Sequence, residues 1–405
     1  MAPDDQMSLS ERNRYLRLMK ERYLNADRRT KGRLLDEMEH ITGLHRKYLI
    51  TRMNSPGRYR RKRSRERCRT YGPDVEAAVA LIGESMDWIC AERLRPQLVP
   101  LAEHLARFDE LGLTPEVRYK LGRISVSTLR RMLHRLRPEA DELPRPRRGR
   151  PREKTVAAQV PMTVIPADQP QVGHFEVDLV YHGPGNLTGP WLYTLQCVDV
   201  LTGWSERFAL PSRKFEAVWA GVQAFKARCP LPIREVHIDN GSEFLNSSFL
   251  SHFGLQFETS DLTRGRPGHK NDNRFVEQKN ASLVRAYLGE LYLDTHEQLT
   301  LLRGIYEQMW LYYNLFQPVL RQSERTAHIG ADGIVRIRRK QDTARSPLDR
   351  LLEAETKLGR ATVDRLLDLR ATTNPLALRR EIHAQLKRLY RLAEREERRR
   401  AAPVR

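Results

Sequence analysis

A change of hydrophobic pattern near residue 172 is the feature that most limits what this 405-residue chain can fold into. Apolar residues alternate with period two over 174–181, and two further strands are predicted at 191–200 and 204–210. A helix at 215–229, a strand at 233–238, a short helix at 242–253, a strand at 255–258 and a long helix at 272–293 follow. The pattern predicts a mixed α/β region whose first three strands form an antiparallel meander.

Three carboxylates stand on these predicted elements: Asp178 in the first strand, Asp239 at the end of the fourth, and Glu277 in the long helix. Strand ends frame the usual crevice of an open α/β sheet, and the Asp-Asn-Gly sequence at 239–241 marks a sharp turn there. Hard cations such as Mg²⁺ prefer carboxylate oxygens, and a pair of them can drive phosphoryl transfer. Because three clustered acids repel one another without metal, we expect a two-ion site for a nucleic-acid substrate.

The residues around these acids resemble the D,D,E transposases and retroviral-type integrases. The string Ile-Asp-Asn-Gly-Ser-Glu-Phe at 238–244 is similar to the second-aspartate motif of the family, and Asp-Asn-Arg-Phe-Val-Glu-Gln-Lys-Asn at 272–280 to its glutamate helix. The resemblance extends loosely to bacterial insertion-sequence transposases that carry an integrase catalytic domain. It implies an RNase H-like catalytic core, in agreement with the predicted order of elements, and 3′-end cleavage with strand transfer. It also implies that Asp178 and Asp239 bridge two metal ions, of which Glu277 holds one.

Two other acids compete with Asp178 for the first metal position. Glu176 shares its strand face, and Asp199 lies in the neighbouring strand. We prefer Asp178 as the ligand and interpret Asp199 as a turn or strand-end residue. Glu243 and Asp272 are interpreted as residues that support the ligands.

The fold class expected for the whole chain is multidomain α+β, with all-α helix-turn-helix domains before the core and a small β piece plus helices after it. The predicted segments are a helix-turn-helix domain at 1–57, a basic linker at 58–72, a second helical DNA-binding domain at 73–140, an Arg/Pro-rich linker at 141–170, the catalytic core at 171–315, a small basic β-rich DNA-binding segment at 316–352, and a helical region at 353–405.

Basic residues on these segments are the candidate DNA contacts. In the first helical domain, the second helix at 44–53 would direct its basic residues to a groove if Leu44, Tyr48 and Leu49 faced inward. Asn273, one turn before Glu277, would point at the same site. The Arg-Gly-Arg-Pro string at 148–151 resembles an AT-hook core, and a solvated basic linker explains it equally well. The candidates are Arg46, Lys47, Arg52, Arg130, Arg131, Arg148, Arg150, Arg264, Arg266, Lys270, Asn273, Arg274 and Lys279.

The C-terminal region carries apolar residues at helical spacing, among them Leu376, Ile382, Leu386 and Leu389. Such a helix either pairs with another subunit or packs on its own chain, and the sequence does not favour one over the other.

The composition of the chain indicates the kind of molecule that it binds. The chain has 71 Lys and Arg against 51 Asp and Glu, a formal charge of +20, which favours a polyanion. We see no apolar run long enough for a membrane span or a signal peptide, and the four cysteines form no metal or disulfide pattern. We expect a cytoplasmic, nucleoid-associated prokaryotic protein.

The partners expected are double-stranded DNA, as terminal inverted repeats and target DNA, and further copies of the chain, with or without a helper ATPase. Two Mg²⁺ ions are the expected cofactors, with Mn²⁺ as a substitute. The alternatives are a DNA-binding regulator that has lost catalysis and an RNase H-like nuclease that cleaves without joining. All three acids are present, which argues against the regulator.

Overall fold

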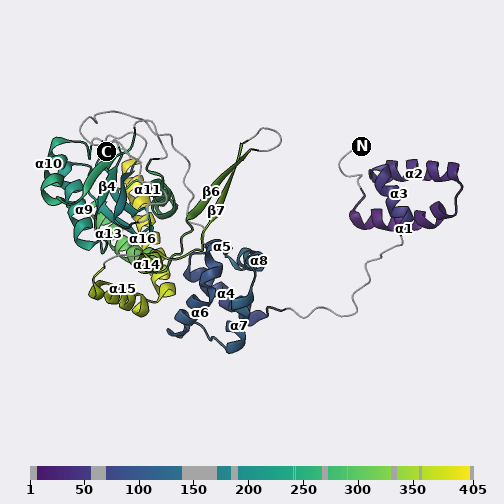
Figure 1. The fold of residues 1–405 in the computed structure, drawn as a ribbon, viewed down its shortest axis with the longest axis horizontal. Coiled ribbons are helices and arrows are strands. Elements are labelled where there is room, and N and C mark those ends of the chain that lie inside the picture. Colours follow the sequence, from purple (N-terminus) through teal and green to yellow (C-terminus); the bar gives the residue numbers. More distant parts are fainter. Residues whose placement is uncertain are drawn as a thin grey trace. The chain divides into compact units, whose positions relative to one another are not determined.

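The computed structural model describes residues 7–55, 70–138, 171–183, 190–239, 241, 243–266, 272–289, 291–329, 335–354 and 358–401 (Figure 1). The chain divides into two compact units, Met1–Thr70 and Tyr71–Arg405. None of the helices within the described ranges is both long and apolar enough to cross a membrane. Each unit is described by itself below.

The first unit is a three-helix bundle of α1 (Leu9–Leu24), α2 (Arg28–Thr42) and α3 (Arg46–Asn54). A capping box at Ser8 begins α1, and Gly43 ends α2 with a φ of 66° that favours glycine. Leu34, Met38, Leu49 and Met53 are among the residues of a core that belongs to this unit alone.

The inward face predicted for α3 is partly wrong. Leu49 is fully buried and Leu44 packs against the core, but Tyr48 is 52% exposed. Lys47 and Arg52 are exposed as well, so aromatic and basic side chains share the outer surface of this helix.

The second unit begins with a helical block that packs around one apolar core. Thr114 and Ser125 accept hydrogen bonds from backbone N–H groups at the starts of its last two helices. The elements of the block are α4 (Pro73–Ser85), α5 (Ala91–Leu94), η2 (Arg95–Gln97), α6 (Leu98–Ala106), α7 (Pro115–Arg123) and α8 (Val126–Leu136).

A mixed five-stranded sheet follows, in the order β3-β2-β1-β4-β5. The first three strands are antiparallel, which confirms the predicted meander, and β4 and β5 run parallel to β1. Helix α9 (Phe215–Arg228) connects β3 to β4 and packs Phe225 edge-on against Phe175, with ring centroids 4.9 Å apart. The strands are β1 (His174–His182), β2 (Leu192–Asp199), β3 (Ser205–Leu210), β4 (Glu235–Ile238) and β5 (Asp261–Arg264).

Two predicted elements of this region are corrected. The fifth strand lies at β5 and not at 255–258, because α10 (Ser247–Gln256) buries Phe249 and Phe253 at helical spacing and continues through Leu255. The long helix predicted at 272–293 ends at Leu288, where Gly289 has a φ of 59°. Its parts are α11 (Arg274–Lys279), the π-helix η4 (Asn280–Arg285) and α12 (Ala286–Leu288).

The C-terminal region adds a two-stranded antiparallel hairpin and helices. The hairpin falls within the segment predicted to be β-rich, but α14 occupies the end of that segment. The elements are α13 (His296–Leu311), the π-helix η5 (Tyr312–Phe316), β6 (Gln322–Ile329), β7 (Val335–Gln341), α14 (Pro347–Glu353), α15 (Arg360–Thr372) and α16 (Pro375–Ala401).

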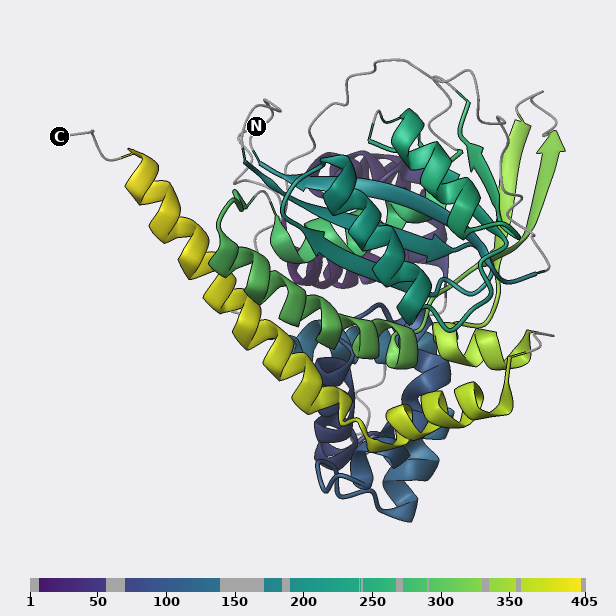
Figure 2. The same ribbon diagram turned by 90° about the vertical axis from the view of Figure 1, so that its left-hand side faces the viewer.

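Helix α16 packs on its own chain. Leu376, Ile382, Leu386 and Leu389 are each 2% exposed or less, and the helix lies alongside α13 (Figure 2). Of the two interpretations left open by the sequence, intrachain packing is the one that the structure shows.

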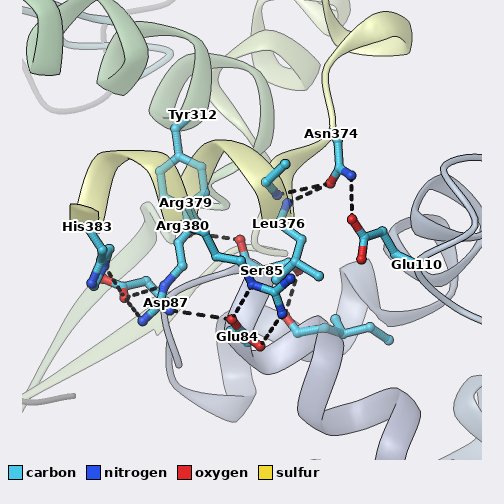
Figure 3. Close-up of polar contacts among 12 residues, drawn as sticks. Glu84, Ser85, Asp87, Glu110, Tyr312, Asn374, Leu376, Arg379, Arg380 and His383 are labelled. Carbon is cyan, nitrogen blue, oxygen red and sulfur yellow. Dashed lines mark hydrogen bonds and ion pairs between the residues drawn. The ribbon is translucent and has the colours of Figure 1, made fainter. Parts of the chain in front are cut away.

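Polar contacts at the start of α16 fasten the helical block to the rest of the second unit (Figure 3). Asp87, which follows α4, accepts hydrogen bonds from Arg379 and the hydroxyl of Tyr287, and forms an ion pair with His383. The hydroxyl of Tyr312 donates to the carbonyl of Ser85 at 2.9 Å. The helical block and the sheet region are therefore parts of one body.

Candidate active site

Register between β1 and β4 brings two of the predicted acids together. Val177 pairs with Ile238 in the parallel ladder, and each is followed directly by an aspartate, Asp178 and Asp239. Neighbouring strands are about 4.8 Å apart, and equivalent residues project from the same face. The two carboxylates are therefore neighbours at one end of the sheet.

The electrostatics of this pair follow from burial and like charge. Burial, the negative charge of Asp178 and that of Glu243 raise the pKa of Asp239 to about 7. Burial also raises the pKa of Asp178, although a hydrogen bond from the backbone N–H of Leu179 and the charge of Arg285 oppose it. Both acids accept a proton more readily than an exposed aspartate does.

Gly241 lets a third carboxylate approach. A side chain at this position would place its Cβ 2.6 Å from Glu243 Oε1 and 2.8 Å from Asp239 Oδ1. The N–H of Gly241 donates to Asp239 Oδ1 at 2.9 Å. The sharp turn predicted after β4 thus holds Glu243, which the sequence suggested only as a supporting residue, next to Asp239.

Asn280 is a site residue to which the sequence gave no role. Its side-chain Nδ2 donates to Asp178 Oδ2 at 2.6 Å, while its buried Oδ1 has no hydrogen-bond partner in the described ranges. It begins the π-helix η4, and such irregular turns are frequent at functional sites. The available signal was its position three residues after Glu277, one turn along the same helix face.

Glu277 lies on α11 one turn before Asn280, and its side chain is exposed. Within the part of the chain that the structure describes, no three His, Cys, Asp or Glu side chains are arranged to hold a metal ion. The structure places Asp178 and Glu243 near Asp239, and it places Glu277 one helical turn before Asn280, which binds Asp178.

The two rivals of Asp178 bind backbone instead. Glu176 accepts hydrogen bonds from the N–H groups of Phe275 and Val276 at 2.7 and 2.8 Å, which caps the start of α11. Burial raises the pKa of Glu176 to about 7, against those hydrogen bonds. Asp199 accepts from the N–H and hydroxyl of Thr202, both at 2.7 Å, and holds the β2–β3 turn.

Two candidate DNA contacts are buried. Arg264 is 5% exposed and Lys279 is 8% exposed, because both side chains turn toward the interior of the second unit. Arg266 is exposed but forms a bidentate pair with Asp272, at 2.9 and 3.0 Å.

The remaining candidates divide by location. Arg46 and Arg130 are in ion pairs with Asp36 and Glu92. Asn273 precedes the first residue of α11. Exposed side chains in the described ranges are those of Lys47, Arg52, Arg131 and Arg274, and Arg148, Arg150 and Lys270 lie outside those ranges.

No family model matches the sequence. An uncharacterized protein of Sinorhizobium fredii, y4rM, is 33% identical over 326 residues, which span 80% of this chain and 91% of y4rM. The chain therefore belongs to the y4rM family.

Two solved structures are similar in part. The catalytic core domain of BIV integrase is 16% identical, with 45% of this chain and 95% of that chain covered and a TM-score of 0.28. A simian T-cell lymphotropic virus intasome in complex with PP2A regulatory subunit B56 gamma is 15% identical, with 46% and 59% covered and a TM-score of 0.24.

Proposed function

We propose that this chain is a metal-dependent transposase or integrase of the D,D,E type, which binds mobile-element DNA ends and catalyses 3′-end cleavage and strand transfer. The observation that carries the proposal is the in-register pair Asp178 and Asp239 on parallel strands. The strand order, with α9 between β3 and β4, supports an RNase H-like core.

The acids near Asp239 are of the ligand type that a hard divalent cation prefers. Burial raises the pKa of Asp178, Asp239 and Glu243, and the charge of Asp178 raises those of Asp239 and Glu243 further, so a cation bound among them would relieve the repulsion. The unpartnered Asn280 Oδ1 is a further oxygen donor. On the resemblance of the motif at 272–280, Glu277 is the third ligand of the D,D,E set.

The residues of the chain have separable tasks in this proposal. Asn280 fixes the carboxylate of Asp178 through its amide, and Gly241 fixes that of Asp239. Two bound Mg²⁺ ions, or Mn²⁺, would supply activation of the attacking hydroxyl and charge neutralisation at the phosphate. Exposed Lys47, Arg52 and Arg131 would bind backbone phosphates of element and target DNA. Because two ends must be joined, the active form would be a homo-oligomer.

The test is strand transfer on a labelled duplex with a mobile-element end, in Mg²⁺. We expect Asp239→Asn to reduce joined products by about 10³-fold or more, because one metal-binding charge is lost. The matched control is Asp261→Asn, an exposed aspartate at the start of β5, which should retain wild-type activity. Equal joining by Asp239→Asn and wild type would eliminate the proposed site.

A second measurement does not require the correct DNA end. Mg²⁺ should raise the melting temperature of the wild-type protein and leave that of Asp239→Asn unchanged. Cleaved but never joined products would favour the nuclease, and salt-sensitive DNA binding without Mg²⁺-dependent stabilisation would favour the regulator.

A further inference from the structure

Helix α11, which carries Glu277, is capped by a residue of another element. The first N–H groups of a helix have no acceptor within the helix, and a short polar side chain just before the helix usually supplies one. Asn273 holds that place, but its side chain caps none of the N–H groups that the structure describes. The acceptor is instead Oε2 of Glu176 on β1, which receives the N–H groups of Phe275 and Val276 at 2.7 and 2.8 Å.

This cap places a carboxylate in the interior of the second unit. Glu176 is 1% exposed, and Val276, to which it binds, is 0% exposed. An apolar residue at this position of β1 would avoid the cost of burying a carboxylate, but it would leave the N–H groups at the start of α11 without an acceptor. The contact fixes where α11 begins relative to β1, because sliding the helix along the strand would break both hydrogen bonds.

A second contact joins the same two segments four residues further along the helix. Asn280 Nδ2 donates to Asp178 Oδ2 at 2.6 Å. Glu176 and Asp178 share one face of β1 and are about 7 Å apart along the strand. Val276 precedes Asn280 by about 6 Å along the helix. Because the two spacings agree, the helix runs alongside the strand, and Glu277 lies in the helix between the two anchored positions.

The side chain of Phe275 also holds the start of the helix. Its ring lies 4.6 Å from the guanidinium carbon of Arg321 and 4.9 Å from that of Arg274. Arg321 in turn donates to the carbonyl of Asp199, at the end of β2, at 3.5 Å. The start of α11 is therefore held through its backbone by β1 and through its first aromatic side chain by a residue that contacts β2.

We propose that Glu176 is a positioning residue, which sets the place of Glu277 beside Asp178 for the binding of a divalent cation. This inference rests on the proposed function, in which Glu277 is the third ligand of the set. Glu176 acts through its hydrogen bonds to α11 and not as a ligand of the cation. Its task requires an acceptor oxygen at that reach and not a negative charge, so glutamine should replace it and a side chain without an acceptor should not.

The test is Mn²⁺ binding to the full chain, followed by the loss of the electron paramagnetic resonance signal of free Mn²⁺, together with strand transfer in Mg²⁺. Glu176→Leu should weaken Mn²⁺ binding and reduce joined products by about 10- to 100-fold each, as is typical when a residue that supports a metal ligand is lost. Glu176→Gln, which keeps the acceptor oxygen, should retain binding and joining close to those of the wild type.

A double variant tests whether Glu176 acts through Glu277. Glu277→Gln should weaken Mn²⁺ binding by itself, and the addition of Glu176→Leu should cause little further loss, because both substitutions remove the same contribution. A fully additive loss would contradict this interpretation.

The matched control is Asn314→Leu. Asn314 is also fully buried, and its side chain binds the backbone N–H and carbonyl of Ser205 on β3, at 2.9 and 3.0 Å. Its substitution removes two buried hydrogen bonds without touching α11. We therefore expect a lower melting temperature and an unchanged affinity for Mn²⁺.

The possible results distinguish this inference from the proposed function. Absence of Mn²⁺ binding by the wild type would overturn both. Wild-type binding that Glu176→Leu leaves unchanged, or that Glu176→Gln weakens as strongly as Glu176→Leu does, would overturn the inference alone. If Glu176→Leu does not fold, Glu176→Asp decides: its shorter side chain keeps the charge but withdraws the acceptor from α11, so it should bind Mn²⁺ more weakly than Glu176→Gln.

Discussion

The two helical parts of the chain resemble each other in sequence pattern and differ in how they are held. Helices α1 to α3 share a core of their own, and the charged pair of Arg46 with Asp36 is open to solvent. Helices α4 to α8 belong to a core that continues through the sheet and α16. The ion pair that corresponds to it in this part joins Asp87 to Arg379, whose side chain is only 5% exposed.

The difference shows which helical part forms a compact unit by itself. In the first unit, α3 is held by a core that consists only of residues of that unit. In the second, Asp87 and Trp88 adopt φ values of 54° and 53°, unusual for residues with a side chain. Contacts from the C-terminal half hold that turn, and helices α4 to α8 are therefore part of the same body as the sheet.

Deleting one helical part at a time should have the largest effect on folding and should distinguish the two parts. Removing residues 1–70 should leave 71–405 folded, with an unchanged melting temperature and reduced binding of element ends. Removing residues 71–138 should prevent folding, because Arg379 and the hydroxyl of Tyr312 would lose buried partners. Thermal melts of the two purified proteins, followed by circular dichroism, measure whether each one folds. A cooperative melt of the sheet region after the second deletion would show that it does not need helices α4 to α8.

Asp87→Ala should have the next largest effect. The substitution removes a carboxylate that lies 3.1 Å from the buried guanidinium of Arg379, so we expect the second unit to lose about 3–5 kcal/mol of unfolding free energy. Chemical denaturation of the full chain, followed through the transition of the second unit, measures the loss. The first unit should unfold as in the wild type. A loss below about 1 kcal/mol would show that this contact does not fasten the helical block.

The same carboxylate predicts a pH dependence. Burial alone would raise the pKa of Asp87, but His383, Tyr287 and Arg379 lower it to about 2. Because the folded pKa lies below the unfolded value of about 3.9, this stabilisation is complete above pH 4 and disappears as the pH falls toward 2.

We expect about 2–3 kcal/mol of unfolding free energy to be lost over that interval. Denaturation of wild type and Asp87→Asn at several pH values between 2 and 5 measures it. The asparagine variant should lack this component, and parallel pH curves for the two proteins would contradict the assignment.

Much of the sheet region is predictable because its strands and turns have local sequence patterns. Period-two alternation located β1, and the Asp-Asn-Gly turn located the end of β4. The parallel register of β1 with β4, which brings Asp178 and Asp239 together, came from the structure. The fifth strand was misplaced because Leu255 continues a helix whose buried residues are Phe249 and Phe253.

The features that the sequence did not predict depend on contacts between residues far apart in the chain. Nothing local in the Glu-Gln-Lys-Asn string at 277–280 shows that Lys279 is buried while its neighbour Asn280 binds Asp178. Likewise the sequence pattern predicted a second helical domain at 73–140. The attachment of this helical block to the sheet region depends on Arg379 and His383, which are nearly 300 residues away from Asp87.

The smallest expected effect comes from the matching substitution in the first unit, Asp36→Asn. Its partner Arg46 also donates to the carbonyl of Gly32, and the backbone N–H of Arg46 donates to Glu39, so the start of α3 stays in place. The pair with Asp36 is solvent-exposed, and we expect a change of at most about 1 kcal/mol in unfolding free energy. Urea denaturation, followed through the transition of the first unit, measures it. A loss as large as that of Asp87→Ala would mean that ion pairs hold both helical parts in the same way.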